Sequence, residues 1–384
     1  MKKRSFGLAP SMARTGQKDQ GMSGYVLYGA EVSYFSGKAR AYLRWRGADF
    51  EERIATREVY RDVILPKVGW PVIPVMEMPG GDVVQDTADI IDAVEAATPD
   101  GPRAMPDGPV QRVVSRLMEL YADEWLVLPA MHYRWNYNED WAYGEFGRIS
   151  APDAPPPEQY AIGRKNGERF KGAVAMLGVS EENIPGVESA YEAFLKDMTE
   201  HLRHHAFLLG ERPSLGDFAL NGPLYAHLLR DPESGRIMER LAPKVADYVR
   251  RVQAGEQGNG EVLADDGVPK TLEPILSRQM SEQMPMLVKT AALFGEWAKS
   301  VKAGADVPRG FGMVEFMTGG FDGDCAARSF PLWRLQAVTD EIDAMDDSAK
   351  MRLAALMDRV GGAPLMEFRL PARLARKDFR LRLA

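Results

Sequence analysis

Strand-like and helix-like segments alternate over the first hundred residues, and their order constrains the fold more than any other feature of the sequence. An aromatic and β-branched run at residues 25–28 predicts a first strand. A helical pattern follows from Ser36 and ends at Gly47, because glycine readily adopts the positive φ of a helix C-terminus. Residues 50–54 then alternate like a second strand. This order is typical of the start of an α/β sheet.

Two more strands are predicted around residues 72–77 and 83–84, with a turn rich in proline and glycine at residues 79–82. Thr87 begins a helix with one apolar side. The order is therefore β-α-β, an irregular segment, and then β-β-α, which predicts a small α/β domain with a mixed sheet.

Helical patterns dominate the rest of the chain. We expect helices at residues 110–135, 159–177, 185–206, from Ser214, and at 272–301 and 332–360, with an exposed proline-rich connector at 150–158 and a glycine-rich loop at 255–267. Strands are predicted at residues 313–317 and 364–370, with a turn at Gly319-Gly320. The resulting division is a flexible arm (1–22), an α/β domain (23–100), a helical domain (106–255) and a C-terminal extension of helices and a short β-hairpin (256–384).

Composition excludes several classes of protein. A net charge of −7 argues against a general nucleic-acid binder, whose surface is usually basic. No apolar run is long enough to cross a bilayer, so we expect no membrane partner. The lone cysteine, Cys325, forbids a disulfide within the chain and favours a cytoplasmic location. His201, His204 and His205 have helical spacing, but a polar helix face explains them better than a metal site, and no metal is predicted.

Three segments have residue types suited to binding a ligand. At residues 33–40 a hydroxyl would lie at the positive end of a helix, where free N–H groups stabilise anions, although Ser33 or Ser36 could simply cap the helix. Pro74 interrupts a strand-like run, so it lies either at a sheet edge or after a cis peptide bond. A cis bond would turn the backbone of Ile73 outward, where a peptide-like ligand could pair with it.

The third segment precedes the helix at Thr87. Its hydroxyl and the free amides of the first turn could hold a carboxylate, while Gln85 and Asp86 could hold an ammonium group. Plain helix capping is the structural alternative. Farther along, Ser214 and Asp217 have the spacing of a capping box that starts a buried helix.

Together and in this order, these segments resemble the glutathione S-transferase superfamily, in particular bacterial, serine-type members with a C-terminal extension. Residues 33–40 resemble the start of the family's first helix, Ile73-Pro74-Val75 resembles its cis-proline element, and residues 86–90 resemble its acidic element before the next helix. The likeness covers about residues 24–253. It implies a thioredoxin-like N-terminal domain, an all-α C-terminal domain and an extra α+β extension.

The resemblance also implies roles for individual residues. Counting back from the arginine of the first helix gives Ser33 as the hydroxyl that activates glutathione. Ile73, Pro74, Asp86 and Thr87 would bind the rest of this co-substrate, with Lys38 and Trp70 at the glycyl end or the rim. Tyr34 replaces the family's usual proline, so Tyr34, Tyr28 and Ser36 stay open as alternative catalytic hydroxyls.

The resemblance implies an enzyme that directs the glutathione thiolate at a small hydrophobic electrophile, within a homodimer. Four aromatic residues are expected to wall the electrophile pocket, unless they simply pack in the core: Tyr121, Trp125, His132 and Trp135. Alternatives are a non-catalytic binding or regulatory protein of the same fold, and a glutathione-dependent peroxidase or lyase.

Overall fold

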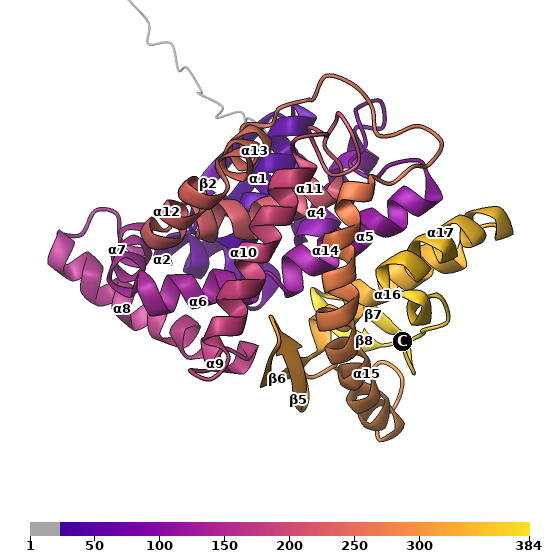
Figure 1. Cartoon of the computed structure of the whole chain (residues 1–384). Helices are drawn as coiled ribbons and strands as arrows, with labels where there is room; N and C mark the ends of the chain where they lie inside the picture. Colours follow the sequence, from indigo (N-terminus) through magenta and orange to yellow (C-terminus); the bar gives the residue numbers. More distant parts are fainter. Residues whose placement is uncertain (1–23) are drawn as a thin grey trace, which may run out of the picture.

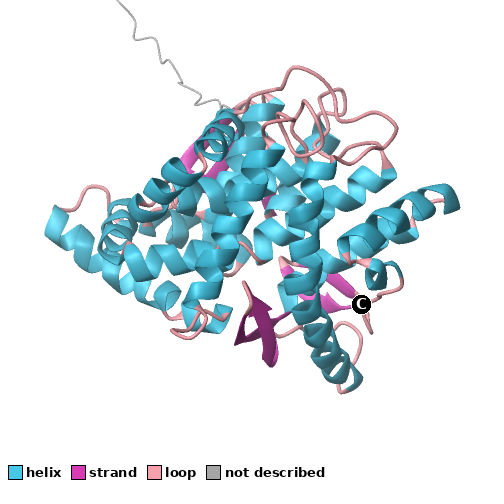
Figure 2. Cartoon of the chain, viewed as in Figure 1, coloured by secondary structure: helices cyan, strands magenta, loops and turns pink. Residues whose placement is uncertain are grey.

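The computed structural model describes residues 24–384, and the expected arm at 1–22 lies outside that part of the chain. Helices form most of the molecule, and three small sheets lie among them (Figures 1 and 2). Among the described residues, none of the helices combines the length and the apolar character that a bilayer crossing requires.

The predicted mixed sheet is confirmed. Its strand order is β2-β1-β3-β4, in which β1 (Tyr25–Gly29) runs parallel to β2 (Phe50–Ile54) and antiparallel to β3 (Val75–Glu77), and β4 (Val83–Gln85) closes the edge. Helices α1 (Tyr34–Arg46) and α4 (Thr87–Ala97) complete the thioredoxin-like unit. The irregular segment between β2 and β3 contains α2 (Arg57–Val59), a π-helical turn (Tyr60–Ile64) and α3 (Leu65–Val68).

Two boundaries in this unit differ from the sequence prediction. Helix α1 starts at Tyr34 because Ser33 already caps it, and it ends as expected at Gly47, whose φ is 68°. The third strand starts at Val75 and not at residue 72. Pro74 lacks the N–H that a ladder needs, and the Ile73–Pro74 peptide bond is cis.

A helical region follows the α/β unit, as predicted. Its helices are α5 (Pro109–Glu124), α6 (Val127–Tyr137), α7 (Glu139–Ser150), α8 (Pro156–Lys171), α9 (Ala173–Leu177), α10 (Ile184–His201), α11 (Leu215–Pro223) with a π-helical continuation (Leu224–Leu229), α12 (Pro232–Leu241) and α13 (Pro243–Ala254). The expected capping box is present at the start of α11, where the buried Asp217 carboxylate accepts hydrogen bonds from both the N–H (2.8 Å) and the hydroxyl (2.9 Å) of Ser214.

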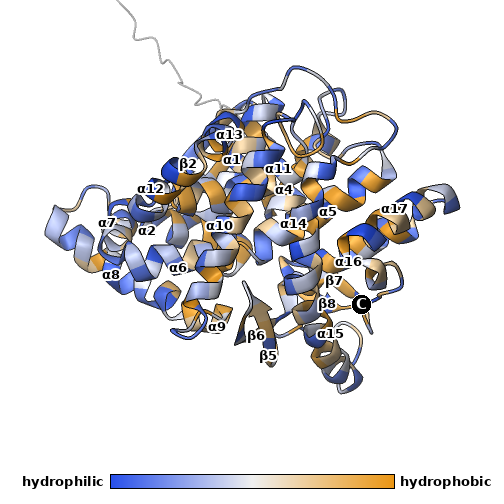
Figure 3. Cartoon of the chain, viewed as in Figure 1, coloured by the Kyte–Doolittle hydropathy of each residue, from blue (hydrophilic) through white to orange (hydrophobic). Residues whose placement is uncertain are grey.

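The proline-rich connector is shorter than predicted, because α8 begins at Pro156 and folds back on α7. Gly147 and Gly163 permit this close approach: a Cβ on either would lie 1.8 Å from a carbonyl oxygen of the facing helix. Helix α8 buries only Gly163 and Gly167, and its ribbon is largely hydrophilic in Figure 3. The α7–α8 pair therefore directs its apolar side inward, toward the β1–α1 loop.

The C-terminal extension contains helices and two hairpins. Its elements are a 3₁₀ turn (Lys270–Leu272), α14 (Glu273–Arg278), a π-helical turn (Gln279–Gln283), α15 (Met284–Lys299), β5 (Gly310–Thr318), β6 (Phe321–Arg328), α16 (Ser329–Asp343), α17 (Asp347–Val360), a 3₁₀ turn (Ala363–Met366), β7 (Leu374–Lys377) and β8 (Arg380–Leu383). The β5–β6 hairpin confirms the strand and glycine turn predicted there.

The strand predicted at residues 364–370 is wrong. Leu365 enters the core from a 3₁₀ turn, and the last strands lie farther on, as the β7–β8 hairpin. Asp378 and Phe379 form its turn with φ values of 49° and 60°, which match the twist of a tight hairpin. Aspartate and phenylalanine indicate a positive φ less clearly than glycine does, so the sequence did not predict this turn.

The extension shares the core of the rest of the chain. Leu335, Val338 and Ile342 of α16 belong to the same buried apolar cluster as Leu117 and Leu120 of α5. Figure 1 shows the extension, drawn in orange to yellow, against α5 and the α/β unit. The boundaries given above at residues 100, 106 and 255 remain a prediction.

His201 of α10 shows how tightly polar groups are fixed in this core. It is fully buried, which corrects the expectation of a polar helix face. Its Nε2–H donates to the carbonyl of Phe207 (3.1 Å), so Nδ1 accepts from the Thr271 hydroxyl (2.9 Å). Burial lowers the pKa of His201 to about 4. The ring is therefore neutral, and both nitrogens are engaged.

We expect His201 to make the fold labile to acid. Between the unperturbed pKa of 6.5 and the folded pKa of about 4, the unfolded state binds a proton that the folded state rejects. The free energy of unfolding should therefore fall as the pH drops through this window, by up to about 3 kcal/mol. Urea unfolding across this range should show a shallower fall for His201→Gln, and an unchanged fall for His204→Gln on the exposed face. Parallel pH profiles for His201→Gln and the unsubstituted chain would contradict this.

Candidate active site

Ser33 lies at the junction of β1 and α1, at the N-terminus of a helix of 13 residues. Its Oγ accepts a hydrogen bond from the N–H of Ser36 (3.3 Å), which is the N-cap arrangement. The side chain is half-buried, and the neighbouring Glu31 is exposed. A ligand at this point would meet a hydroxyl donor and the positive end of the helix dipole.

The three alternative hydroxyls point elsewhere. Tyr34 donates to the carbonyl of Ala122 in α5, and burial raises the pKa of this phenol well above its usual value. The fully buried Ser36 hydroxyl accepts from the N–H of Ala30 (3.3 Å). Tyr28 donates to Glu77 (3.3 Å), and burial together with this carboxylate raises the pKa of Tyr28. Ser33 is thus the one of the four that is only half-buried.

A buried arginine of α6 holds the loop that carries Ser33. Arg134 donates to the backbone carbonyl of Val32 (2.8 Å) and forms a two-pronged ion pair with Asp231 (both 2.7 Å). It also donates to Nε2 of His227 (2.9 Å), whose Nδ1–H bonds the carbonyl of Ala130 (3.2 Å). Burial and the charge of Arg134 keep the pKa of His227 well below its ordinary value. Arg134 is a positioning residue that the sequence reasoning missed.

The cis peptide bond places Ile73 and Pro74 just before β3, beside Ser33's loop. The sheet ladder starts at Val75, so the backbone of Ile73 lies outside it. Trp70 belongs to the same apolar cluster as Ile73. The Arg309 guanidinium of the extension lies 5.2 Å from the Trp70 ring, and Phe379 of the last hairpin packs on this cluster. The predicted rim is therefore covered by the extension.

Asp86 and Thr87 stand where β4 passes into α4. Asp86 has a φ of 84°, unusual for a residue with a side chain, and its carboxylate caps Ala88 N–H (3.0 Å). Thr87 is only 1% exposed, and its hydroxyl has no hydrogen-bond partner. A buried polar atom without a partner costs free energy, so an unpaired hydroxyl here is consistent with a ligand-binding role.

Two arginines of the extension reach this same segment. Arg334 of α16 pairs with Asp86, and Arg376 of β7 pairs with Asp89 and Gln85. Burial would raise the pKa of Asp86, but the charges of Arg334, Arg376 and Lys38 hold it below its ordinary value. The sequence around Asp86 does not predict these two arginines as partners, because they lie far along the chain.

Lys38 is not at the glycyl end or the rim, and this expectation is corrected. Its ammonium is fully buried and donates to Glu119 and Asp123 of α5, each at 2.7 Å. Burial and the nearby Glu119 raise the pKa of Asp123, whereas Lys38 and two arginines lower that of Glu119 despite its burial. Lys38 therefore joins α1 to α5.

The predicted aromatic pocket is also corrected. Tyr121, Trp125, His132 and Trp135 are at most 4% exposed. Their partners are core or extension residues: Tyr121 contacts Phe194, Trp125 contacts Phe316, and Trp135 contacts Tyr143 and Phe146. His132 bonds Glu188 (3.0 Å). The periodic aromatic pattern marked core packing.

An apolar surface next to Ser33's loop comes instead from α7. Trp141 and Phe146, both half-buried, and Ile149 cluster with Ala30, Val32 and Ile73. Helical spacing of these apolar residues was the available signal, but the polar residues among them and the glycines obscured it. This α7 surface is our candidate wall for a hydrophobic substrate.

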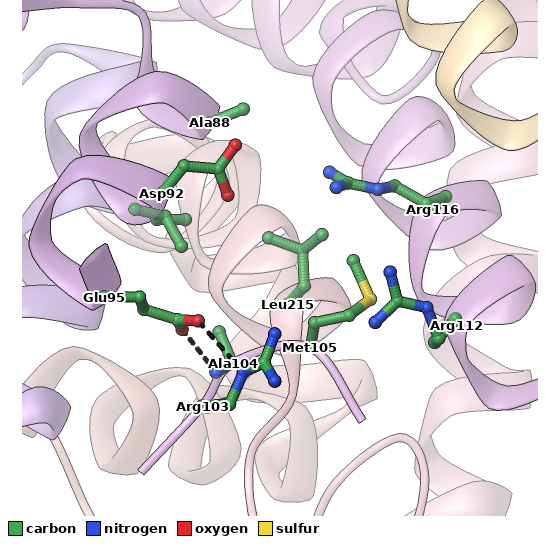
Figure 4. A pocket seen from close by; sticks show the side chains of 10 residues that line it. Ala88, Asp92, Glu95, Arg103, Ala104, Met105, Arg112, Arg116 and Leu215 are labelled. Atoms are coloured by element: carbon green, nitrogen blue, oxygen red, sulfur yellow. Dashed lines mark hydrogen bonds and ion pairs between the residues drawn. The ribbon is translucent and has the colours of Figure 1, made fainter. Parts of the chain in front are cut away.

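Two cavities lie away from Ser33. One, of about 80 Å³, lies between α4 and α5, where Asp92 and Glu95 face Arg112 and Arg116 (Figure 4). Both arginines also contact Glu341 of α16. The other, of about 360 Å³, borders Trp141 on the side of α12. No cluster of three or more His, Cys, Asp or Glu side chains between residues 24 and 384 is placed to hold a metal ion.

We expect Arg134→Lys to lower the free energy of unfolding by about 2 kcal/mol or more, because lysine cannot reproduce the fixed donors that reach Val32, Asp231 and His227. Arg148→Lys is the matched control: that arginine pairs with Glu145 at the surface, so its loss should change stability by no more than about 0.5 kcal/mol. Equal Tm values for the two variants would contradict a special role for Arg134.

Comparison with known proteins finds a similarity in the N-terminal part of the chain. A family model described as "Glutathione S-transferase, N-terminal domain" matches residues 27–103. No curated protein matches the chain. Similar solved structures include the glutathione transferase GSTFuA3 from Phanerochaete chrysosporium (15% identity, 62% of this chain and 99% of that chain, TM-score 0.45) and the beta-etherase LigF from Sphingobium sp. strain SYK-6 (19%, 61% and 97%, 0.44).

A further similar structure is the glutathione S-transferase CsGST63524 of Ceriporiopsis subvermispora in complex with glutathione (15% identity, 62% of this chain and 100% of that chain, TM-score 0.43). The matched segment 27–103 contains the mixed sheet, the cis proline and the residues around Asp86 described above. Residues 27–103 therefore form an N-terminal domain of the glutathione S-transferase type.

Proposed function

We propose that the protein is a glutathione transferase in which Ser33 stabilises the glutathione thiolate. The observation that carries this proposal is the position of Ser33, whose half-buried hydroxyl lies at the N-terminus of α1. The hydroxyls of Tyr28, Tyr34 and Ser36 instead form hydrogen bonds with other groups of the protein. Family membership supports the thiol ligand. The cytoplasmic location and the homodimer stay predictions.

The chemistry requires the thiol to lose its proton at neutral pH. A hydrogen bond from Ser33 and the dipole of α1 favour the anion and so lower the thiol pKa from about 8.5 toward neutrality. The thiolate then attacks a carbon of the electrophile: a sulfur–carbon bond forms, the leaving group departs with its electron pair, and the thiol proton goes to water.

The proposed substrate class follows from the surface beside Ser33's loop. The α7 surface offers apolar contact through the half-buried Trp141 and Phe146, and Trp141 adds a flat indole ring. Arg134 and Arg230 lie 5.9 and 5.6 Å from the Trp141 ring and help to fix it. This surface favours a small hydrophobic electrophile.

The experiment compares Ser33→Ala with Ser33→Thr and Tyr34→Phe. With bound glutathione, thiolate absorbance followed against pH should give a thiol pKa about one to two units higher in Ser33→Ala, which corresponds to roughly a tenfold to hundredfold loss in kcat/KM toward chlorodinitrobenzene. Ser33→Thr keeps the hydroxyl and Tyr34→Phe removes an inward one, so both should stay near the unsubstituted value.

Ser33 also caps α1, so Ser33→Ala should lower stability by about 1 kcal/mol, and assays belong well below its Tm. The proposal fails if bound glutathione shows no thiolate at neutral pH, or if Ser33→Ala retains full turnover. The first outcome would favour a binding protein of this fold without catalysis.

A further inference from the structure

Three side chains around the start of α4 form what we call the acidic corner: Gln85, Asp86 and Asp89. In a site for glutathione, these are the groups suited to accept hydrogen bonds from the α-ammonium of the γ-glutamyl unit. All three already hold a cation, because Arg334 pairs with Asp86 and Arg376 pairs with Asp89 and Gln85. The cations of the chain itself therefore take the positions that a ligand ammonium would need.

The other carboxylates near the corner are paired as well. Glu119 contacts Lys38 (2.7 Å) and Arg116 (3.0 Å). Oδ2 of Asp123 contacts Lys38 (2.7 Å) and lies 4.0 Å from Nε of Arg334, so two cations flank this carboxylate, whose other oxygen has no hydrogen-bond partner. An incoming ammonium would meet repulsion here from fixed positive charges.

Arg334 is a permanent part of this corner. Its side chain is 5% exposed, and its guanidinium lies 5.1 Å from the ring of Phe330. The next residue of α16, Leu335, is fully buried in the main core. The packing of α16 on the main core therefore holds Arg334 at Asp86.

Arg376 is held less deeply, on the β7–β8 hairpin. Gln336 of α16 binds the hairpin through two hydrogen bonds. Its side-chain amide donates to the carbonyl of Leu374 (3.0 Å) and accepts from the N–H of Leu374 (2.8 Å). Leu374 is buried, and Arg376 lies two residues on and therefore on the same side of the strand. Its side chain is 9% exposed, so it can be replaced with less damage to the core than Arg334.

Unused hydrogen-bond donors remain at the corner. Nε of Arg334 and the hydroxyl of Thr87 are buried without a partner. Both can donate a hydrogen bond to a carboxylate. The N–H groups at the start of α4 also favour a negative charge at this position, because they form the positive end of the helix dipole. The corner thus offers donors for an anion, while each of its three acceptor side chains already faces an arginine.

We propose that Arg334 and Arg376 determine ligand specificity, because their guanidinium groups occupy the positions at the acidic corner that the ligand's ammonium would take. The site therefore recognises a thiol ligand through its carboxylate, and an amine on the ligand adds no binding free energy. The ligand class is a thiol peptide whose N-terminal unit is recognised through its carboxylate, and it includes both glutathione and its amine-free analogues. This inference rests on the proposed function, since it concerns the same thiol site.

The test uses the full chain and two thiols in isothermal titration calorimetry: glutathione, and its des-amino analogue in which a glutaryl group replaces γ-glutamyl. We expect the unsubstituted protein to bind the analogue at least as tightly as glutathione. Arg376→Gln frees Asp89 and Gln85, so it should shift the preference toward glutathione by about tenfold, the scale of one charge-assisted hydrogen bond. Arg376→Lys and Arg380→Gln, the latter on the exposed side of the same hairpin, should keep the original preference.

Two results would overturn the inference and leave the proposed function standing. The first is a preference of tenfold or more for glutathione in the unsubstituted protein, which would show that its ammonium has an acceptor. The second is an equal gain in affinity for both thiols in Arg376→Gln, which would show that the hairpin obstructs the site without distinguishing the two ligands. If no protein variant binds either thiol or S-hexylglutathione, the proposed function itself fails and the inference with it.

Discussion

A buried set of ion pairs joins four parts of the chain, and the rest of the structure depends on it. Lys38 comes from α1, Glu119 and Asp123 from α5, Asp86 from the start of α4, and Arg334 from α16 of the extension. Charges of this kind are tolerated in a core only when each has its partners, since removal of one leaves another uncompensated. The α/β unit, the helical region and the extension therefore need one another to bury this set.

This constraint explains why the extension lies where it does. Its apolar residues close the main core over α5, while Arg334 and Arg376 neutralise the acidic start of α4. Arg112 and Arg116 of α5 meet Glu341 of α16 in the same way. The extension is thus held by complementary charge as well as by buried apolar surface, and it covers the start of α4 in the α/β unit.

Local patterns made much of the fold predictable. The mixed sheet, the N-cap at Ser33, the glycine that ends α1 and the capping box at Ser214 each depend on residues close in sequence. Contacts between distant segments were not predictable: Arg334 and Asp86 are 248 residues apart, and no spacing rule links them. Lys38 shows the limit most clearly, because its place in a family-like motif suggested a ligand contact, whereas its environment is set by two carboxylates on α5. The aromatic residues of α5 and α6 were predicted to line a pocket but lie in the core. Their helical spacing is the same in both cases, so it cannot distinguish a pocket wall from a buried helix face.

Hydrogen–deuterium exchange of the full chain tests most directly whether the extension is an integral part of the site. If the buried ion pairs bind it as described, the amides of α16 should be protected to an extent comparable to those of α5, and both should exchange through global unfolding. Rapid exchange throughout α16 and the β7–β8 hairpin, with α5 still protected, would contradict the account.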